Sequence, residues 1–280
     1  MKKPLDSFSN RRNHEVILDC ATLSSAIAEL GASAIHPDGV TLINQSTVLS
    51  AGGFPYRVTQ PGSYRLSGDL IANTTAISIY ANDVTLDLNS FQVLCNCSAV
   101  PGIASYGSGT AILNGYILGC RGALTSVGPD GCGIYFAGPR ARVNRVRVSE
   151  SLDGIYAEEG VDLSVTASTV SNNGGDGIVC RDGALTVGNS IIAGNGNRGI
   201  VTSRSALITG NTIDGNAQTG IDVGAGSVVA VSDNIIANHL YTGVFARGGT
   251  TAIDSNTFVS NGTHWFAAGA VSIKNNVCEG

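Results

Sequence analysis

Two aspartates at matching places in a repeated sequence are the first candidates for chemistry. Asp153 precedes the dipeptide Gly154-Ile155, and Asp176 precedes Gly177-Ile178, 23 residues later. If the repeats stack as coils, these carboxylates lie on neighbouring coils with backbones about 4.8 Å apart. Carboxylates that close can share a proton, which raises one pKa, or bind a hard cation such as Ca²⁺. A carboxyl separation of about 5 Å also suits a retaining glycosidase.

Structural roles for the same residues stay open. Arg198 precedes the next dipeptide, Gly199-Ile200, and would neutralise Asp176 in a ladder of ion pairs. Aspartate before glycine is also ordinary turn chemistry. With Asp222, Asp153 and Asp176 form the set of catalytic candidates. No other cofactor and no firm set of metal ligands is assigned.

Residues that follow each Gly-Ile dipeptide form two columns on one outward strand face. Side chains alternate along a strand, so the isoleucine points inward and the next residue outward. The candidate substrate-binding residues in and beside these columns are Tyr135, Tyr156, Glu158, Arg181, Arg198, Phe245 and Arg247. Aromatic rings stack on sugar rings, and charges pair with hydroxyls or uronates. Ordinary exposed sheet residues and a subunit interface are the open alternatives, so a homo-oligomer is one expectation.

Two loop histidines are weaker candidates for an acid/base corner. His239 lies close to Tyr241 in the loop before Gly243, and His264 precedes Trp265, the only tryptophan. A histidine beside an aromatic ring could transfer protons next to a bound sugar. Loop histidines are more often solvated polar residues, and Trp265 is expected to close the end of a stack.

The element that positions all these residues is a repeat. Gly133-Ile134 is followed by equivalent dipeptides at steps of 21, 23, 22, 21 and 23 residues. Residues 206–223 show one unit, with short apolar strands at 207–208, 212–213 and 221–223 separated by turn residues. Such strands bury little alone, so like units must stack. The repeat predicts an all-β fold, a right-handed parallel β-helix of about nine coils.

Asparagines recur in register with the repeat. One column is aligned through Ser168, Asn211, Asp233 and Asn256, and the second contains Asn173, Asn195, Asn216, Asn238 and Asn261. Amides stacked at the coil spacing can hydrogen-bond along the stack. The columns therefore predict asparagine ladders, with the register near Asn189-Ser190-Ile191 left unresolved.

Composition narrows the function classes. The net charge is −5 and the 16 basic residues are scattered, which argues against a nucleic-acid partner. No apolar run approaches the roughly 20 residues of a membrane span.

A disulfide among Cys97, Cys120 and Cys132 would pin the insertion at 121–131 and imply an oxidising compartment. Cys180 falls on an inward position and is expected in the core.

The first segment differs from the repeats, and we divide the chain at residue 39. Residues 13–33 carry an apolar stripe from Val16 to Leu30 that predicts a helix. This helix would cap the stack at 40–280 and protect its open edge. Alternatively, Arg11-Arg12 and the following apolar stretch form a degraded export leader that is cleaved.

The segments FPYRVTQPGSYRLSGDL at 54–70 and ISIYANDVTLDLNSFQVL at 77–94 resemble the first coils of exported right-handed β-helix proteins of bacteria, in the pectate-lyase-like superfamily. The resemblance implies the fold and a secreted, periplasmic or cell-surface location. The chain lacks the WIDH-type motif of pectate lyases, the polygalacturonase set and the YGFDPH motif of alginate epimerases. Ser272-Ile273-Lys274 only partly matches the RIK element, so no catalytic residue is carried over.

These observations favour an exported β-helix protein whose outward face binds a polysaccharide or cell-surface glycan, and that cleaves or modifies it if it is an enzyme. Polysaccharide lyase or glycoside hydrolase chemistry would then be expected. The competing class is a non-catalytic structural, adhesive or oligomerising module.

Overall fold

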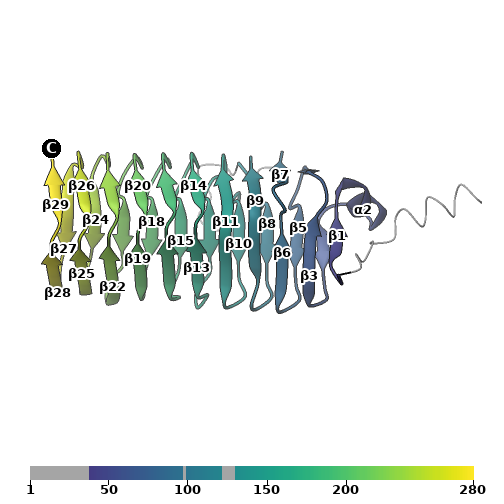
Figure 1. Cartoon of the computed structure of the whole chain (residues 1–280), viewed down its shortest axis with the longest axis horizontal. Helices are drawn as coiled ribbons and strands as arrows, with labels where there is room; N and C mark the ends of the chain where they lie inside the picture. Colours follow the sequence, from purple (N-terminus) through teal and green to yellow (C-terminus); the bar gives the residue numbers. More distant parts are fainter. Residues whose placement is uncertain (1–37, 97–98, 122–129) are drawn as a thin grey trace, which may run out of the picture. The chain divides into compact units, whose positions relative to one another are not determined.

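The computed structural model describes residues 38–96, 99–121 and 130–280, which form a parallel β-helix (Figure 1). Each regular coil contributes three short strands, and strands of successive coils pair in parallel. The predicted fold is therefore confirmed. One sheet contains ten strands, so the stack has about ten coils rather than nine.

One strand from each coil forms what we call the ten-strand sheet. Its members are β2 (Tyr56–Val58), β5 (Ile77–Ile79), β8 (Ile103–Ser105), β10 (Ile134–Phe136), β12 (Ile155–Ala157), β15 (Ile178–Cys180), β18 (Ile200–Thr202), β21 (Ile221–Val223), β24 (Thr242–Ala246) and β27 (Thr263–Ala267).

The remaining strands form the nineteen-strand sheet, in two rows joined by the long strands β9 (Ala111–Leu118) and β11 (Ala141–Ser149). The first row contains β1 (Thr41–Ile43), β3 (Gly62–Leu66), β6 (Val84–Asp87), β13 (Leu163–Thr166), β16 (Leu185–Gly188), β19 (Ala206–Thr209), β22 (Ser227–Ser232), β25 (Gly249–Asp254) and β28 (Ala270–Lys274). The second row contains β4 (Leu70–Ala72), β7 (Gln92–Cys95), β14 (Thr169–Ser171), β17 (Ile191–Ala193), β20 (Thr212–Asp214), β23 (Ile235–Ala237), β26 (Thr257–Val259) and β29 (Val277–Glu279).

The glycine of the repeated dipeptide is needed where two coils approach closely. A Cβ at Gly199 would lie 2.6 Å from the carbonyl oxygen of Gly220 on the next coil and 3.2 Å from the side chain of Ile213. The following isoleucine is fully buried, as Ile155 and Ile200 show. The dipeptide thus brings the chain close to the next coil and then fills the core.

Two ladders of buried amides run along the stack, and both were predicted. In one, Asn211 donates from its backbone N–H and its Nδ2 to Oδ1 of Asn234, at 2.9 and 3.0 Å. In the other, Asn195 donates in the same way to Asn216, at 3.1 and 2.8 Å. Each rung satisfies backbone groups that would otherwise be buried without a partner.

Two details of the predicted register are corrected. The first ladder contains Ser190, whose backbone N–H donates to Asn211 at 2.9 Å, which resolves the uncertain segment. In the second ladder, His239 occupies the place predicted for Asn238, because its backbone N–H donates to Asn261 Oδ1 at 3.2 Å. Asn238 is exposed and donates to Asp214 instead. The predicted alignment fails there because the inward apolar residue is Ile236, not Ile235. The same one-residue shift makes Asn234 the rung of the first ladder, where Asp233 was predicted.

The two ends of the described stack are closed differently. A short helix, α2 (Gln45–Ser50), follows β1 and begins with a capping box between Asn44 and Thr47; the sequence did not predict it. The helix predicted at 13–33 and the residues of the export-leader hypothesis lie outside the described residues. At the other end, Trp265 packs against the core beside Phe258, with ring centroids 5.1 Å apart, as expected.

The cysteine predictions have different outcomes. Cys180 is buried in the core, which confirms its predicted role, and burial raises the pKa of its thiol to about 11. Cys97 lies outside the described residues, so the proposed disulfide stays a prediction. Cys120 and Cys132 are both buried.

Candidate functional site

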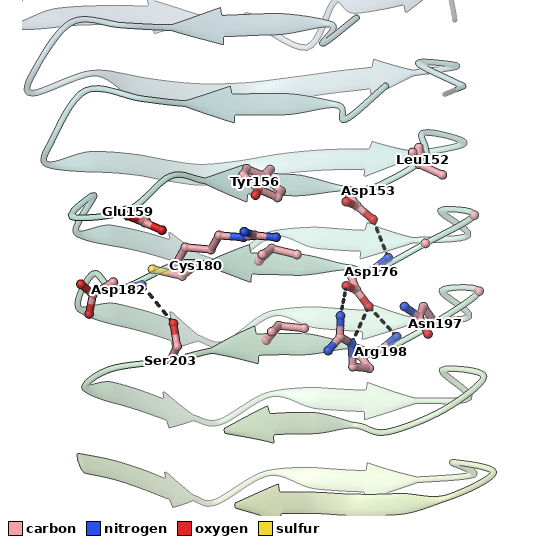
Figure 2. Close-up of a pocket in the computed structure, with 16 residues that line it drawn as sticks. Leu152, Asp153, Tyr156, Glu159, Asp176, Cys180, Asp182, Asn197, Arg198 and Ser203 are labelled. Carbon is pink, nitrogen blue, oxygen red and sulfur yellow. Dashed lines mark hydrogen bonds and ion pairs between the residues drawn. The ribbon is translucent and has the colours of Figure 1, made fainter. Parts of the chain in front are cut away.

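A groove of about 620 Å³ opens on the outward face of the ten-strand sheet, over β12, β15 and β18. We call it the aspartate groove (Figure 2). Its lining residues include five predicted ones: Asp153, Tyr156, Asp176, Arg181 and Arg198. Sequence reasoning missed others along its margin, namely Leu152, Glu159, Asp182 and Asn197, because they lie in turns whose conformation the repeat does not specify.

The polar residues of the groove are aligned by the backbone before each repeated dipeptide. The N–H of Gly154 donates to the carbonyl of Asp176 at 3.0 Å, and the N–H of Gly177 donates to the carbonyl of Arg198 at 2.9 Å. Asp153, Asp176 and Arg198 therefore occupy equivalent positions on three successive coils. The predicted column is confirmed.

Asp153 lines the groove and forms no ion pair with a described arginine. Its Oδ1 accepts a 2.7 Å hydrogen bond from the backbone N–H of Asp176. Burial raises the pKa of Asp153 to about 6, although that hydrogen bond opposes the shift. The side chain can therefore gain or lose a proton near neutral pH, which is the property of a general acid or base.

Asp176 belongs to a ladder of ion pairs. Both of its oxygens accept from Arg198, at 3.0 Å from Nε and 2.7 Å from Nη2. Arg198 Nη1 also donates to Oδ2 of Asp222 at 3.0 Å, and Arg247 donates to the same oxygen at 2.8 Å. Burial lowers the pKa of Arg198, but these carboxylates more than offset it and leave the pKa above its usual range.

The ladder separates the three aspartates predicted to be catalytic. Asp176 and Asp222 are buried and neutralised by arginines, and Asp222 does not line the groove. A retaining glycosidase needs one carboxylate ready to attack, whereas both oxygens of Asp176 are occupied. The structural alternative, an ion ladder, is thus present, and Asp153 is the remaining candidate for acid/base chemistry.

The predicted aromatic face is largely covered rather than exposed. Tyr156 and Val179 form a small apolar cluster with Cys132, separate from the core, and they are only 3% and 5% exposed. Tyr135 packs against this cluster and donates from its hydroxyl to Glu158 at 3.3 Å. Burial, followed by the charge of Glu158, raises the pKa of Tyr135 to about 12. Outward side chains cover one another because successive coils bring them into van der Waals contact.

Arg181 connects this cluster to the groove. Its guanidinium lies over the ring of Tyr156, 5.4 Å from the centroid. Such a cation–π contact holds the charged group at the groove wall without a carboxylate partner.

Sequence reasoning missed two tyrosines that extend the aromatic surface. Tyr80 and Tyr106 follow β5 and β8, are 49% and 47% exposed, and stack with centroids 5.1 Å apart. Tyr106 contacts Tyr135 at 6.0 Å, and Tyr135 contacts Tyr156 at 6.2 Å. We call these four residues, on four consecutive coils, the tyrosine path. It leads to the aspartate groove at Tyr156.

Phe245 and Arg247 form a second group away from the groove. The guanidinium of Arg247 lies 5.2 Å from the centroid of Phe245, which stacks on Phe266 at 5.1 Å. Asp222, which pairs with both Arg247 and Arg198, connects these residues to the groove. The structure thus divides the predicted binding residues into two groups.

The predicted histidine corner is wrong for His239. Its side chain is buried in the asparagine ladder, with ring nitrogens 3.3 and 3.1 Å from the carbonyls of Asn216 and Ile213. Burial lowers its pKa. His264 lies against Phe258 in the last coil, with ring centroids 5.8 Å apart. Neither ring is available in the groove.

The side chains that could bind a metal ion are not grouped in the described residues. Among residues 38–96, 99–121 and 130–280, no three His, Cys, Asp or Glu side chains gather in an arrangement that could hold a metal ion. Ca²⁺ between Asp153 and Asp176 stays a prediction, and it would compete with the guanidinium of Arg198.

A family model described as "Periplasmic copper-binding protein (NosD)" matches residues 101–276, which is more than half of the chain. The chain belongs to the NosD family. No curated protein sequence matches it significantly. The described residues of this NosD-family chain contain no helix long and apolar enough to cross a membrane.

Solved structures resemble the NosD-family chain in fold. The Dettilon tailspike protein (gp208) is 15% identical with a TM-score of 0.55; the match covers 90% of this chain and 64% of the tailspike chain. This chain therefore spans less than two thirds of that protein. A variant of the periplasmic alginate epimerase AlgG is 11% identical with a TM-score of 0.51, covering 86% of this chain and 75% of the epimerase.

Proposed function

We propose that this protein binds a polysaccharide along the outward face of the ten-strand sheet, with one sugar unit held in the aspartate groove. The observation that carries the proposal is the tyrosine path, which leads over four consecutive coils to that groove. A sugar chain lying parallel to the stack would contact one coil after another.

The chemistry of the path fits sugars. Tyr80 and Tyr106 offer exposed ring faces on which the apolar face of a pyranose can pack. Beyond the path, the groove offers carboxylates from Asp153, Glu159 and Asp182 as acceptors for sugar hydroxyls. The coil spacing of about 4.8 Å is comparable to the length of one hexose unit, so a regular polymer can repeat its contacts.

The names of the relatives support the same proposal. The epimerase that shares the fold is named for its action on alginate, a polysaccharide. The family description and that epimerase are both called periplasmic, which supports an exported location for this chain. The partner would then be a polysaccharide or cell-surface glycan outside the cytoplasm.

If the bound sugar is also modified, Asp153 is the residue we assign to proton transfer. Its raised pKa provides both protonation states near pH 6. Asp176 and Arg198 then act as positioning residues, because the backbone N–H of Asp176 fixes the Asp153 carboxyl. Lyase or hydrolase chemistry remains the expected class.

Copper, named in the family description, is not part of this proposal. Copper sites use thiolate, thioether or imidazole ligands. In the described residues, Cys132 and Cys180 are buried apart from any group of three donors, and the imidazole of His239 is enclosed in a ladder. These residues do not fit a copper site.

The test is binding to a glycan array, followed by titration with the best oligosaccharide. We expect Tyr106→Ala to weaken binding about five-fold, because stacking contributes on the order of 1 kcal/mol. Tyr241→Ala is the matched control, since Tyr241 is 58% exposed and lies off the path. The bound oligosaccharide is also tested for release of product. If the Asp153→Asn variant still binds the oligosaccharide but releases no product, the assignment of proton transfer to Asp153 is supported.

One result would favour the competing function. If no glycan binds and Tyr106→Ala dissociates a concentration-dependent oligomer, the aromatic face is a subunit interface and the proposal is wrong. Sedimentation of both variants distinguishes the two cases.

A further inference from the structure

A second cavity, of about 420 Å³, lies over the bend of β9 and β11 in the nineteen-strand sheet. We call it the arginine pocket. Arg145, Arg147, Tyr116 and Thr169 contribute to its walls, and Gly115 and Ala167 leave it space. It shares no lining residue with the aspartate groove.

The two arginines of this pocket carry uncompensated charge. No aspartate or glutamate lines the cavity. Arg145 and Arg147 are exposed, and neither forms an ion pair with another described residue. They flank Val146, whose side chain is in the core. Two guanidinium groups are thus held on one outward surface with donors available for an anion.

The backbone at Arg145 is an independent sign of a site. Its φ is +55°, the left-handed region, at a bend where equivalent positions on other coils are mostly Asn, Asp, Ser or Gly. Asn114 on the preceding coil and Asn189 two coils later are examples. Arginine is disfavoured in this region and asparagine is tolerated. A long cationic side chain stands here at a conformational cost, and such strain is concentrated at functional sites.

Tyr116 adds a surface for the body of the ligand. It pairs in register with Arg147 across β9 and β11, and its side chain is 43% exposed. An exposed ring beside a guanidinium can pack on a sugar while the arginine pairs with an acidic substituent.

We propose that the arginine pocket binds one acidic sugar unit, with its carboxylate, sulfate or phosphate group between Arg145 and Arg147 and its ring against Tyr116. At about 420 Å³ the cavity is large enough for one sugar unit and falls in the range of small-molecule sites. The net charge of −5 would repel a long polyanion such as a nucleic acid, which favours a single anionic unit.

The experiment is an isothermal titration of the full chain with galacturonate, glucose 6-phosphate and neutral glucose. Saturable binding of an acidic sugar, without binding of glucose, is expected. The two acidic probes distinguish a carboxylate from a phosphate ester. Affinity should fall as salt rises, because the charges are exposed.

Two variants and one control locate the site. Arg147→Ala and Arg145→Asn should each weaken binding about ten-fold or more, because charge-assisted hydrogen bonds are lost. Asparagine tolerates the left-handed backbone conformation at position 145, so Arg145→Asn is not expected to impair folding. Arg142→Ala is the matched control, since Arg142 is exposed on the same strand but does not line the pocket.

Three outcomes would overturn the inference. These are absence of saturable binding of either acidic sugar, wild-type affinity in both the Arg145→Asn and the Arg147→Ala variant, and tighter binding of a short single-stranded oligonucleotide than of any sugar. The result is independent of the tyrosine path, because Tyr106→Ala should leave this binding unchanged.

Discussion

The aspartate groove and the arginine pocket use the same repeated backbone in opposite ways. In the groove, Arg198 is paired with two buried carboxylates, and its side chain is 29% exposed. In the pocket, Arg145 and Arg147 are exposed and face no carboxylate. The first arrangement ties three coils together, whereas the second leaves charge available to a ligand.

The comparison shows that burial decides what a charge does in this fold. A buried charge must be paired, and removal of one partner leaves the other uncompensated. An exposed charge contributes little to stability and is strongly screened. We therefore expect substitutions in the groove to change the free energy of unfolding and substitutions in the pocket to change binding.

The largest effect is expected from Arg198→Met. This change leaves the carboxylates of Asp176 and Asp222 buried without their shared arginine, so unfolding free energy should fall by about 3–5 kcal/mol. Urea unfolding measures it. Arg204→Ala is the control, because Arg204 and Asp182 are both more than 60% exposed and 3.9 Å apart, and its effect should be below about 1 kcal/mol. Equal effects would show that burial does not decide how much these ion pairs stabilise the protein.

Asp153→Asn should stabilise the protein at high pH. The folded pKa of Asp153, about 6, is above its ordinary value, so the protonated form favours folding. That contribution is fully present below about pH 4 and is lost as the pH rises through about 6. The variant should exceed the wild type by about 2–3 kcal/mol at about pH 8 and match it at about pH 3. A difference that does not depend on pH would mean that Asp153 is not buried as described.

Arg145→Asn should stabilise the protein slightly, opposite in sign to Arg198→Met. Asparagine adopts a φ of +55° more readily than arginine, so a gain of about 0.5–1 kcal/mol in unfolding free energy is expected. Thermal unfolding at neutral pH measures it. A loss of stability would show that the arginine is part of the framework and not available for a ligand.

A rise in salt concentration should have the smallest effect on the free energy of unfolding. It should therefore separate the buried ion pairs of the groove from the exposed arginines of the pocket. The Debye length falls from about 10 Å at 0.1 M to about 3 Å at 1 M ionic strength. The carboxylate of Asp222 is buried although its arginine partners are partly exposed, so the stability lost in Arg198→Met should change little over this range. Binding to the arginine pocket should weaken markedly. Parallel titrations at the two salt concentrations test both statements.

The regular part of the fold could be predicted because the same residue types recur at equivalent positions of each repeat. Close approach of coils requires glycine at positions such as Gly199, and buried amides at Asn195 and Asn216 form rungs. The column containing Asp153, Asp176 and Arg198 follows directly from that register.

Contacts that do not follow the repeat register could not be predicted from the sequence. Tyr106 lies four residues after Gly102, whereas Tyr135 lies two residues after Gly133, so the repeat does not place them in one column. Their contact is diagonal, and small residues at Ala104 and Ala137 leave it room. The substitution of His239 for an amide and the left-handed bend at Arg145 depend on backbone conformation, which residue types alone did not reveal.

The asparagine ladders also give the stack a polarity. Each rung donates toward the C-terminal neighbour and accepts from the N-terminal one, as Asn211 does between Ser190 and Asn234. The second ladder runs the same way, because Asn195 accepts from the N–H of Asn173 and donates to Asn216. The buried amides of both ladders therefore share one direction along the stack, and their dipoles add instead of cancelling.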